Sequence, residues 1–194
     1  MGKKQKNAPQ QAIAKEENKQ ISQKTLGFWE NTRLHLGIIA ALAFLLYANT
    51  LTHQYCQDDA IVITENMFTQ KGIAGFGGIL SEDTFFGFFK EAGKENLVAG
   101  GRYRPFTLLM FATEYQFFGN NPFIGHLLNV VFFALLCVLF YKITARLLSF
   151  RADLEKNAVK IAFVAAIIFA LHPIHTEAVA NIKGRDEIMA LLGS

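Results

Sequence analysis

Charged residues are scarce in this 194-residue chain, where 18% of the residues are Asp, Glu, Lys or Arg, against about 25% in ordinary soluble domains. Hydrophobic residues make up 52% of it, and 19 residues are Phe. That balance excludes a disordered chain and a soluble enzyme. The basic face with interleaved aromatics that a nucleic-acid-binding protein needs is missing too, so no nucleic-acid partner is expected. The composition predicts an integral membrane protein.

Cysteine is rarer still, with only Cys56 and Cys137, and Cys137 lies inside an apolar run. Two cysteines so far apart exclude a disulfide framework and a zinc site of the usual spacing. The GxSxG, P-loop, dinucleotide-binding and CxxC motifs are also absent. The familiar motif-based enzyme classes are therefore not supported.

Three segments are apolar enough to be membrane spans. Residues 34–51 and 123–143 have the length of a bilayer helix. A third apolar run begins at 161 and reaches a spanning length when it is extended through His172-Pro173 to about 180, and residues 188–194 look like the opening of a fourth span. The predicted fold class is all-α, a polytopic helical membrane protein.

The segments that flank the spans differ in charge. The polar tail 1–33 has a net charge of +4 and the segment 142–160 has +3, whereas the long loop 52–122 has −3. Cytoplasmic loops carry the excess of Lys and Arg. We therefore expect the N-terminus in the cytoplasm, and the loop 52–122 and the residues after His172 together on the outer side.

One helix within this outer loop is expected to lie in the membrane interface. Pro105 suits the first helical position, and Gly119 suits the stop after residue 118. Fourteen residues extend about 21 Å, which is too short to cross a bilayer. Asn121-Pro122 then begins the next helix as N-cap and first residue.

Four polar clusters on the outer side could carry chemistry. Asp58-Asp59 could supply a general base or oxygen ligands for a divalent cation, or be two solvated charges. Arg102-Tyr103-Arg104 could bind phosphate oxygens or anchor the chain at the interface.

The other two clusters follow the third span. His172, His175 and Glu177 resemble a metal box but lack the spacing of HExxH, so hydrogen bonding to a substrate is favoured over a metal. The last cluster is Lys183-Gly184-Arg185-Asp186-Glu187, where Gly184 is expected to break the helix and to present Arg185 in a turn. This cluster could be a phosphate site or a plain surface turn. His126 and Asn129, inside the second span, are expected to hydrogen-bond neighbouring helices rather than to bind a ligand.

The order of these clusters resembles a known family. The blocks YRPFTLLMFATEYQFFGNNPFIGHLLNVVFFALL (103–136) and FALHPIHTEAVANIKGRDEIMALL (169–192), together with DDAIVITEN (58–66), are similar to the N-terminal part of C-type (GT-C) glycosyltransferases that use polyprenyl-phosphate sugars. The closest likeness is to the transmembrane and tetratricopeptide-repeat protein O-mannosyltransferases and their bacterial relatives.

This resemblance implies transfer of a sugar, a hexose such as mannose, from a polyprenyl-phosphate donor to an acceptor hydroxyl. The acceptor is implied to be a Ser or Thr of a protein outside the cytoplasm. The resemblance implies Asp58 as general base with Asp59 in reserve. It also implies Arg104, Lys183 and Arg185 at the donor phosphate, with a substrate pocket formed by Arg102, Tyr103, His172, His175, Glu177 and Glu187. No metal site is expected.

The same family carries a repeat module and further helices that these 194 residues do not contain. We therefore expect the front portion of a larger enzyme, inactive alone, in a bacterial inner membrane or, in a eukaryote, the endoplasmic reticulum membrane. The alternatives are a non-catalytic membrane subunit and a protein that binds or transports lipid-linked sugars.

Overall fold

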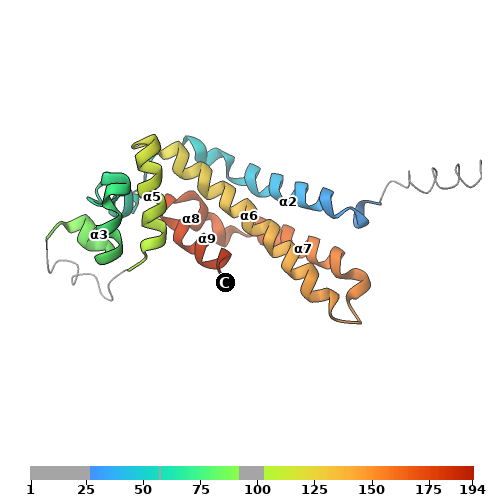
Figure 1. Cartoon of the computed structure of the whole chain (residues 1–194). Helices are drawn as coiled ribbons and strands as arrows, with labels where there is room; N and C mark the ends of the chain where they lie inside the picture. The colour runs from blue at the N-terminus through green and yellow to red at the C-terminus, as the bar shows by residue number, and fades with distance from the viewer. Residues whose placement is uncertain (1–26, 57, 92–102) are drawn as a thin grey trace, which may run out of the picture.

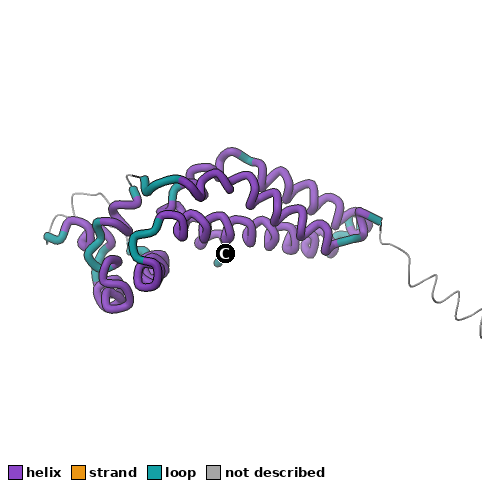
Figure 2. The backbone as a smooth tube through the Cα atoms, turned by 90° about the horizontal axis from the view of Figure 1, so that it is seen from above, coloured by secondary structure: helices purple, strands orange, loops and turns teal. Residues whose placement is uncertain are grey.

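The computed structural model describes residues 27–56, 58–91 and 103–194 (Figure 1). This part of the chain is helical and contains no strand, which confirms the all-α prediction (Figure 2). The α-helices are α2 (Thr32–Tyr47), α3 (Phe76–Ser81), α4 (Thr84–Phe89), α5 (Pro105–Phe118), α6 (Pro122–Ser149), α7 (Ala158–Leu171), α8 (Thr176–Ala180) and α9 (Arg185–Leu192). Short 3₁₀ or π-helical segments connect them: η1 (Phe28–Glu30), η2 (Ala48–Thr52), η3 (Ala60–Thr64), η4 (Thr69–Gly75), η6 (Glu155–Asn157), η7 (Pro173–His175) and η8 (Ile182–Gly184).

Helices α2, α6 and α7 run side by side and form an elongated bundle (Figures 1 and 2). Along α7, every fourth residue from Ala158 to Ala170 is a buried alanine. Small side chains at this spacing lie on one helix face and let two backbones approach closely, as membrane helices require. Larger core side chains come from the facing helices: Ile39 and Tyr47 of α2, and Val130, Phe133, Leu136 and Cys137 of α6.

Two helical stretches are long and apolar enough to cross a membrane, Thr32–Thr52 and Pro122–Ser149. The third predicted span is divided, because Glu155–Leu171 and Pro173–Ala180 meet at an angle of 49°. His172 has an extended backbone there, and Pro173 starts a new helical turn. A proline disfavours helical geometry at the residue before it, which explains the position of the bend.

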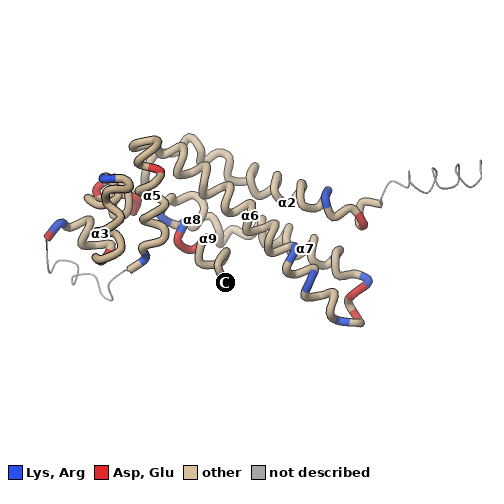
Figure 3. Tube along the Cα trace, viewed as in Figure 1, with Lys and Arg blue, Asp and Glu red and all other residues tan. Residues whose placement is uncertain are grey.

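Among the residues that the structure describes, charged positions are absent from the middle of the bundle (Figure 3). They gather at its two ends, around the connection between α6 and α7 and around the end that carries α3, α5 and α9. This separation is what a bilayer imposes on a spanning bundle, since a charge in the hydrocarbon core is costly.

The segment between α2 and α5 builds a second, smaller core against α5. Val62, Ile63, Phe68 and Ile79 pack with the α5 residues Leu108, Phe111 and Ala112, and Ile182 joins them from η8. Helix α5 stands across one end of the bundle (Figures 1 and 2). It begins and ends at the predicted residues, and the Asn121 side chain accepts a hydrogen bond from the Phe123 N–H at the start of α6. This crossing brings the loop after α2, the start of α5 and the chain after α7 to one place.

Candidate active site

A polar cavity of about 110 Å³ opens where these segments meet. The loop after α2 contributes Asp58, the residue before α5 contributes Arg104, and the segment 177–187 contributes the rest of the wall. Five of the predicted site residues line it together: Asp58, Arg104, Glu177, Lys183 and Glu187. Residues up to 129 positions apart in sequence therefore form one charged site.

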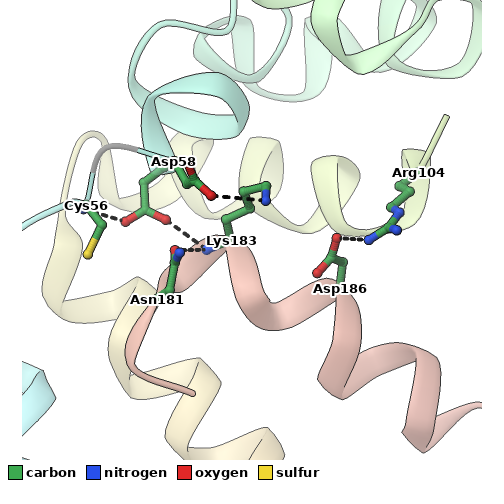
Figure 4. Close-up of polar contacts among 7 residues, drawn as sticks. Cys56, Asp58, Arg104, Asn181, Lys183 and Asp186 are labelled. Carbon is green, nitrogen blue, oxygen red and sulfur yellow. Dashed lines mark hydrogen bonds and ion pairs between the residues drawn. The ribbon is translucent and has the colours of Figure 1, made fainter. Parts of the chain in front are cut away.

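Asp58 and Asp59 have different environments although they are adjacent. Asp58 has 53% of its side chain exposed, lines the cavity, and lies 3.4 Å from the Lys183 Nζ (Figure 4). Asp59 is fully buried and accepts hydrogen bonds from the N–H groups of Cys56 (2.8 Å) and Lys183 (2.8 Å). Only Asp58 can meet a substrate in the cavity, whereas Asp59 fixes the loop to the turn that carries Lys183.

Burial is the main influence on the pKa of Asp59 and raises it above the ordinary value of a carboxyl. The two backbone N–H groups and nearby His126 oppose that rise, because they stabilise the ionised form. On Cys56, burial and the charges of Asp59 and Asp58 raise the thiol pKa. The surroundings of both groups therefore favour the uncharged form.

Lys183 is held from its backbone as well as from its side chain. The Asn181 side chain accepts a hydrogen bond from the Lys183 N–H at 3.1 Å, beside the bond to Asp59 (Figure 4). Gly184 follows in a tight turn, where a Cβ would lie 2.5 Å from the carbonyl oxygen of Ala178. The turn therefore requires glycine for reasons of space.

Gly184→Ala is expected to lower the free energy of unfolding by about 2 kcal/mol, because backbone rather than a flexible side chain must move to admit the methyl group. Thermal unfolding of the purified protein measures this. Gly193→Ala is the matched control, since its Cβ would be 3.4 Å from the nearest atom, the Met189 oxygen. Equal unfolding temperatures for the two variants would contradict the tight turn.

Arg104, which also lines the cavity, forms an ion pair with Asp186 (Figure 4). The Arg104 side chain is 52% exposed and that of Asp186 is 14% exposed. Asp186 lies in the first turn of α9, where a helix N-terminus stabilises a carboxylate. Two cations and four carboxylates thus surround this small space, since Glu177 and Glu187 complete the wall.

Arg185 is not presented in a turn, and that expectation was wrong. It is the first residue of α9 and is fully buried. Its Nε donates to Asn129 Oδ1 at 2.7 Å, one terminal nitrogen donates to the Glu114 carboxylate and the other to the Gly125 carbonyl at 3.0 Å. The guanidinium also lies 4.6 Å from the centre of the Phe111 ring. Arg185 therefore joins α5, α6 and α9 beside the cavity instead of facing into it.

Asn129 supports the same region from inside α6. Its amide nitrogen donates to the carbonyls of Asn181 (2.9 Å) and Ile182 (3.2 Å), and its oxygen accepts from Arg185. This agrees with the expectation that Asn129 bonds to a neighbouring segment. His126 is buried and packs edge-on to His53, with ring centroids 6.1 Å apart.

The remaining predicted residues lie outside the cavity wall. The Tyr103 hydroxyl donates to the Leu80 carbonyl at 2.7 Å. His172 is exposed and its Nδ1 accepts from the Ile174 N–H, while His175 packs on Phe169 with ring centroids 4.4 Å apart. Arg102 lies outside the residues that the structure describes. Across the described ranges, no group of three or more His, Cys, Asp or Glu side chains is arranged to hold a metal ion.

Sequence reasoning missed Asp186, Glu114 and Asn181 as contributors to this region. Asp186 was visible only as one acid in a charged run, and its role depends on Arg104, 82 positions away. Glu114 lies in α5, the helix expected at the membrane interface, where burial raises its carboxyl pKa and the Arg185 charge opposes that rise. The sequence signal that could have identified Glu114 is a glutamate within a largely apolar helix.

Curated proteins similar to this chain carry one shared description. Protein O-mannosyl-transferase TMTC1 of Homo sapiens is 33% identical over 156 residues, which is 80% of this chain and 16% of the relative. Protein O-mannosyl-transferase TMTC2 of Mus musculus is 33% identical over 162 residues, covering 80% of this chain and 17% of the relative. Protein O-mannosyl-transferase F38B6.6 of Caenorhabditis elegans is 31% identical over 160 residues, covering 82% and 22%.

The chain thus spans less than a quarter of the length of these relatives. No protein-family model matches the chain, and no solved structure matches it either.

Proposed function

We propose that this chain, as a member of the protein O-mannosyl-transferase family, forms the N-terminal part of an enzyme. The proposed enzyme moves mannose from a polyprenyl-phosphate donor to a Ser or Thr hydroxyl of a protein. The transfer is proposed to take place on the extracytoplasmic face of the membrane. The observation that carries the proposal is the polar cavity at the end of an apolar bundle, where the exposed carboxylate of Asp58 lies beside the Lys183 cation and Arg104 lines the same space. The phosphate of a lipid-linked donor would bind at a charged site of this kind, near the end of the membrane-spanning helices.

In the proposed reaction, Asp58 is the general base. Its carboxylate takes the proton of the acceptor hydroxyl while the hydroxyl oxygen attacks C1 of the sugar. The bond between C1 and the phosphate oxygen breaks, and the polyprenyl phosphate leaves with the bonding electrons. The proton ends on Asp58, from which water removes it.

Arg104 and Lys183 are proposed to bind the phosphate and to stabilise the charge that develops on it as it leaves. Guanidinium and ammonium groups both suit phosphate oxygens, and a site with little water strengthens the attraction. These two cations make a bound metal unnecessary in this mechanism. Glu177 and Glu187 are proposed to bind hydroxyls of the sugar or the acceptor, and Arg185 to position the Lys183 turn. No role is proposed for Tyr103, His172 or His175.

The test is transfer by the full-length protein in lipid vesicles, with radiolabelled mannose on a polyprenyl phosphate and a Ser/Thr-rich peptide as acceptor. We expect label on the peptide, released by β-elimination as O-linked mannose. Label on the peptide from a nucleotide-linked mannose in the absence of the lipid donor, or none from the lipid donor, would contradict the proposed function.

A lipid-linked-sugar carrier is the competing function. Transporters place their binding groups near the middle of the membrane. In the part of the chain that the structure describes, charged residues lie instead at the two ends of the bundle (Figure 3). This distribution favours an enzyme with its site at one rim.

We further propose that the cavity faces the outside and that the N-terminus is cytoplasmic, in a bacterial inner membrane or the endoplasmic reticulum membrane of a eukaryote. Cys56 is exposed at the cavity end, whereas Asp153 lies at the far end of the bundle between α6 and α7. A membrane-impermeant maleimide added outside, or from the lumenal side, should label Cys56 and should not label a cysteine placed at 153. The opposite pattern would invert the topology.

The pH dependence of this labelling has a defined sign. Because the Cys56 thiol pKa is raised, little reactive thiolate is present at neutral pH, and the labelling rate should increase as the pH rises toward that pKa. Asp58→Asn removes one of the charges that raise the pKa, so it should accelerate labelling at pH 7.5 by about two- to threefold. An unchanged rate would show that the carboxylate of Asp58 does not influence the thiol.

A further inference from the structure

The ion pair between Arg104 and Asp186 lies at the junction of three hollows in the surface. One is the polar cavity, and the second is a small pocket of about 20 Å³ under Phe85 and Phe111. The third is an open groove of about 500 Å³, lined mainly by the apolar residues Pro105, Phe106, Met189 and Ala190. Arg104 and Asp186 are the two residues that line all three, so their pair forms the wall between a charged space and an apolar one.

Both cations of the cavity already have a carboxylate partner. Lys183 contacts Asp58, and Arg104 contacts Asp186. A phosphate group that binds either cation therefore competes with its carboxylate partner and can replace it. The cost of that replacement is part of the affinity for any anionic ligand.

The two ion pairs differ in how easily an anionic ligand can replace the carboxylate. Lys183 is fixed through its backbone N–H to Asp59 and Asn181, which holds its position whatever its side chain contacts. Arg104 has a half-exposed side chain. If Arg104 turns away, Asp186 remains stabilised in the first turn of α9. The Arg104–Asp186 pair is therefore the one that a ligand opens at the smaller cost.

We propose that Asp186 is an internal counter-ion which holds Arg104 in the unliganded protein, is displaced by the donor phosphate, and restricts the site to a singly charged phosphodiester. This inference rests on the proposed function, since it assumes a lipid-linked phosphate donor. A phosphodiester brings one negative charge and replaces the one that Asp186 supplied. A diphosphate brings additional charge beside Asp186, Glu187 and Asp58, where repulsion opposes it.

The test uses the full-length protein in lipid nanodiscs, with two probes that share one isoprenoid chain. Methyl farnesyl phosphate is a phosphodiester, and farnesyl diphosphate carries more negative charge. For Asp186→Asn we expect the Kd of the phosphodiester to fall about threefold to fivefold, the range that loss of an exposed ion pair gives. The Kd of the diphosphate should fall about twentyfold, because a charge next to the extra phosphate is removed. The ratio between the Kd of the diphosphate and the Kd of the phosphodiester therefore becomes smaller in the variant.

Asp153→Asn is the matched control, because Asp153 forms an exposed ion pair with Arg151 at the other end of the bundle, with an Nε–Oδ1 distance of 3.2 Å. It should leave both Kd values unchanged. If the Asn variant is not monodisperse after purification, Asp186→Ser keeps an N-terminal helix residue without the charge and carries the same expectation.

Weaker binding of both probes to Asp186→Asn would overturn the inference, since it would show that Asp186 orients Arg104 for the phosphate. Unchanged binding of both would overturn it as well. Failure of the wild-type protein to bind either probe would overturn the proposed donor site itself. Binding by the wild type with no effect of Asp186→Asn would leave the donor site intact and remove only the role of Asp186.

Discussion

Asp58→Asn should lower the rate of mannose transfer by about 10²- to 10⁴-fold, the range that loss of a positioned general base produces. Asn keeps the size of the side chain but cannot accept the proton. Lys183 also loses its partner 3.4 Å away, so the KM for the donor should stay the same or fall slightly. The variant should therefore separate catalysis from binding.

Two comparisons make this result specific. Glu177→Gln removes another cavity carboxylate and should reduce the rate by about tenfold or less, because Glu177 is proposed to bind hydroxyls and not to move the proton. Asp59→Asn should mainly reduce stability, since buried Asp59 accepts two backbone hydrogen bonds. Full activity of Asp58→Asn would contradict the assignment of the base, above all if Asp59→Asn were the inactive one.

Glu114→Gln should lower the free energy of unfolding by about 3–5 kcal/mol, the usual cost of leaving one member of a buried ion pair without its partner. The Arg185 guanidinium would remain fully buried. Its bonds to Asn129 and Gly125 do not neutralise its charge. Helices α5 and α9 would then lose the charged contact that joins them beside the cavity.

Cys137 offers a reporter for this loss. It is buried in the bundle core. In a Cys56→Ser background, a thiol-reactive dye detects the exposure of Cys137 on heating.

The double variant Glu114→Gln with Arg185→Met should recover part of the stability, because an apolar side chain replaces the buried charge. Asp153→Asn, in an exposed ion pair, should change stability by less than about 0.5 kcal/mol. A similar small change for Glu114→Gln would contradict the buried pair.

The parts of the fold that sequence predicted well depend on local signals. Helix α5 begins at Pro105 and stops before Gly119, and α6 begins after Asn121, because a proline, a glycine in a positive-φ conformation (φ 63°) and an N-cap side chain each act within one turn. The apolar stretches that predict the membrane spans are local signals too. The bend after Leu171 followed from Pro173 in principle, but its angle depends on what the next turn packs against.

The parts that sequence could not predict depend on contacts between distant residues. Asp58 and Asp59 could not be distinguished, because the difference between them is made by Lys183, more than 120 positions away. Arg185 resembled a surface cation until Glu114 and Asn129 enclosed it. A single sequence gives the types of residue in a charged run but not which of them face the cavity.

Photo-crosslinking of the donor to the site is the most direct test of the claim that the polar cavity binds a polyprenyl-phosphate sugar. A donor analogue with a diazirine on the isoprene unit next to the phosphate would be bound to the full-length protein in vesicles and irradiated. We predict adducts around Arg104 and in the segment 183–190, which excess unlabelled donor should abolish. Adducts confined to the connection between α6 and α7 at the other end of the bundle, or adducts that excess donor does not reduce, would contradict the claim.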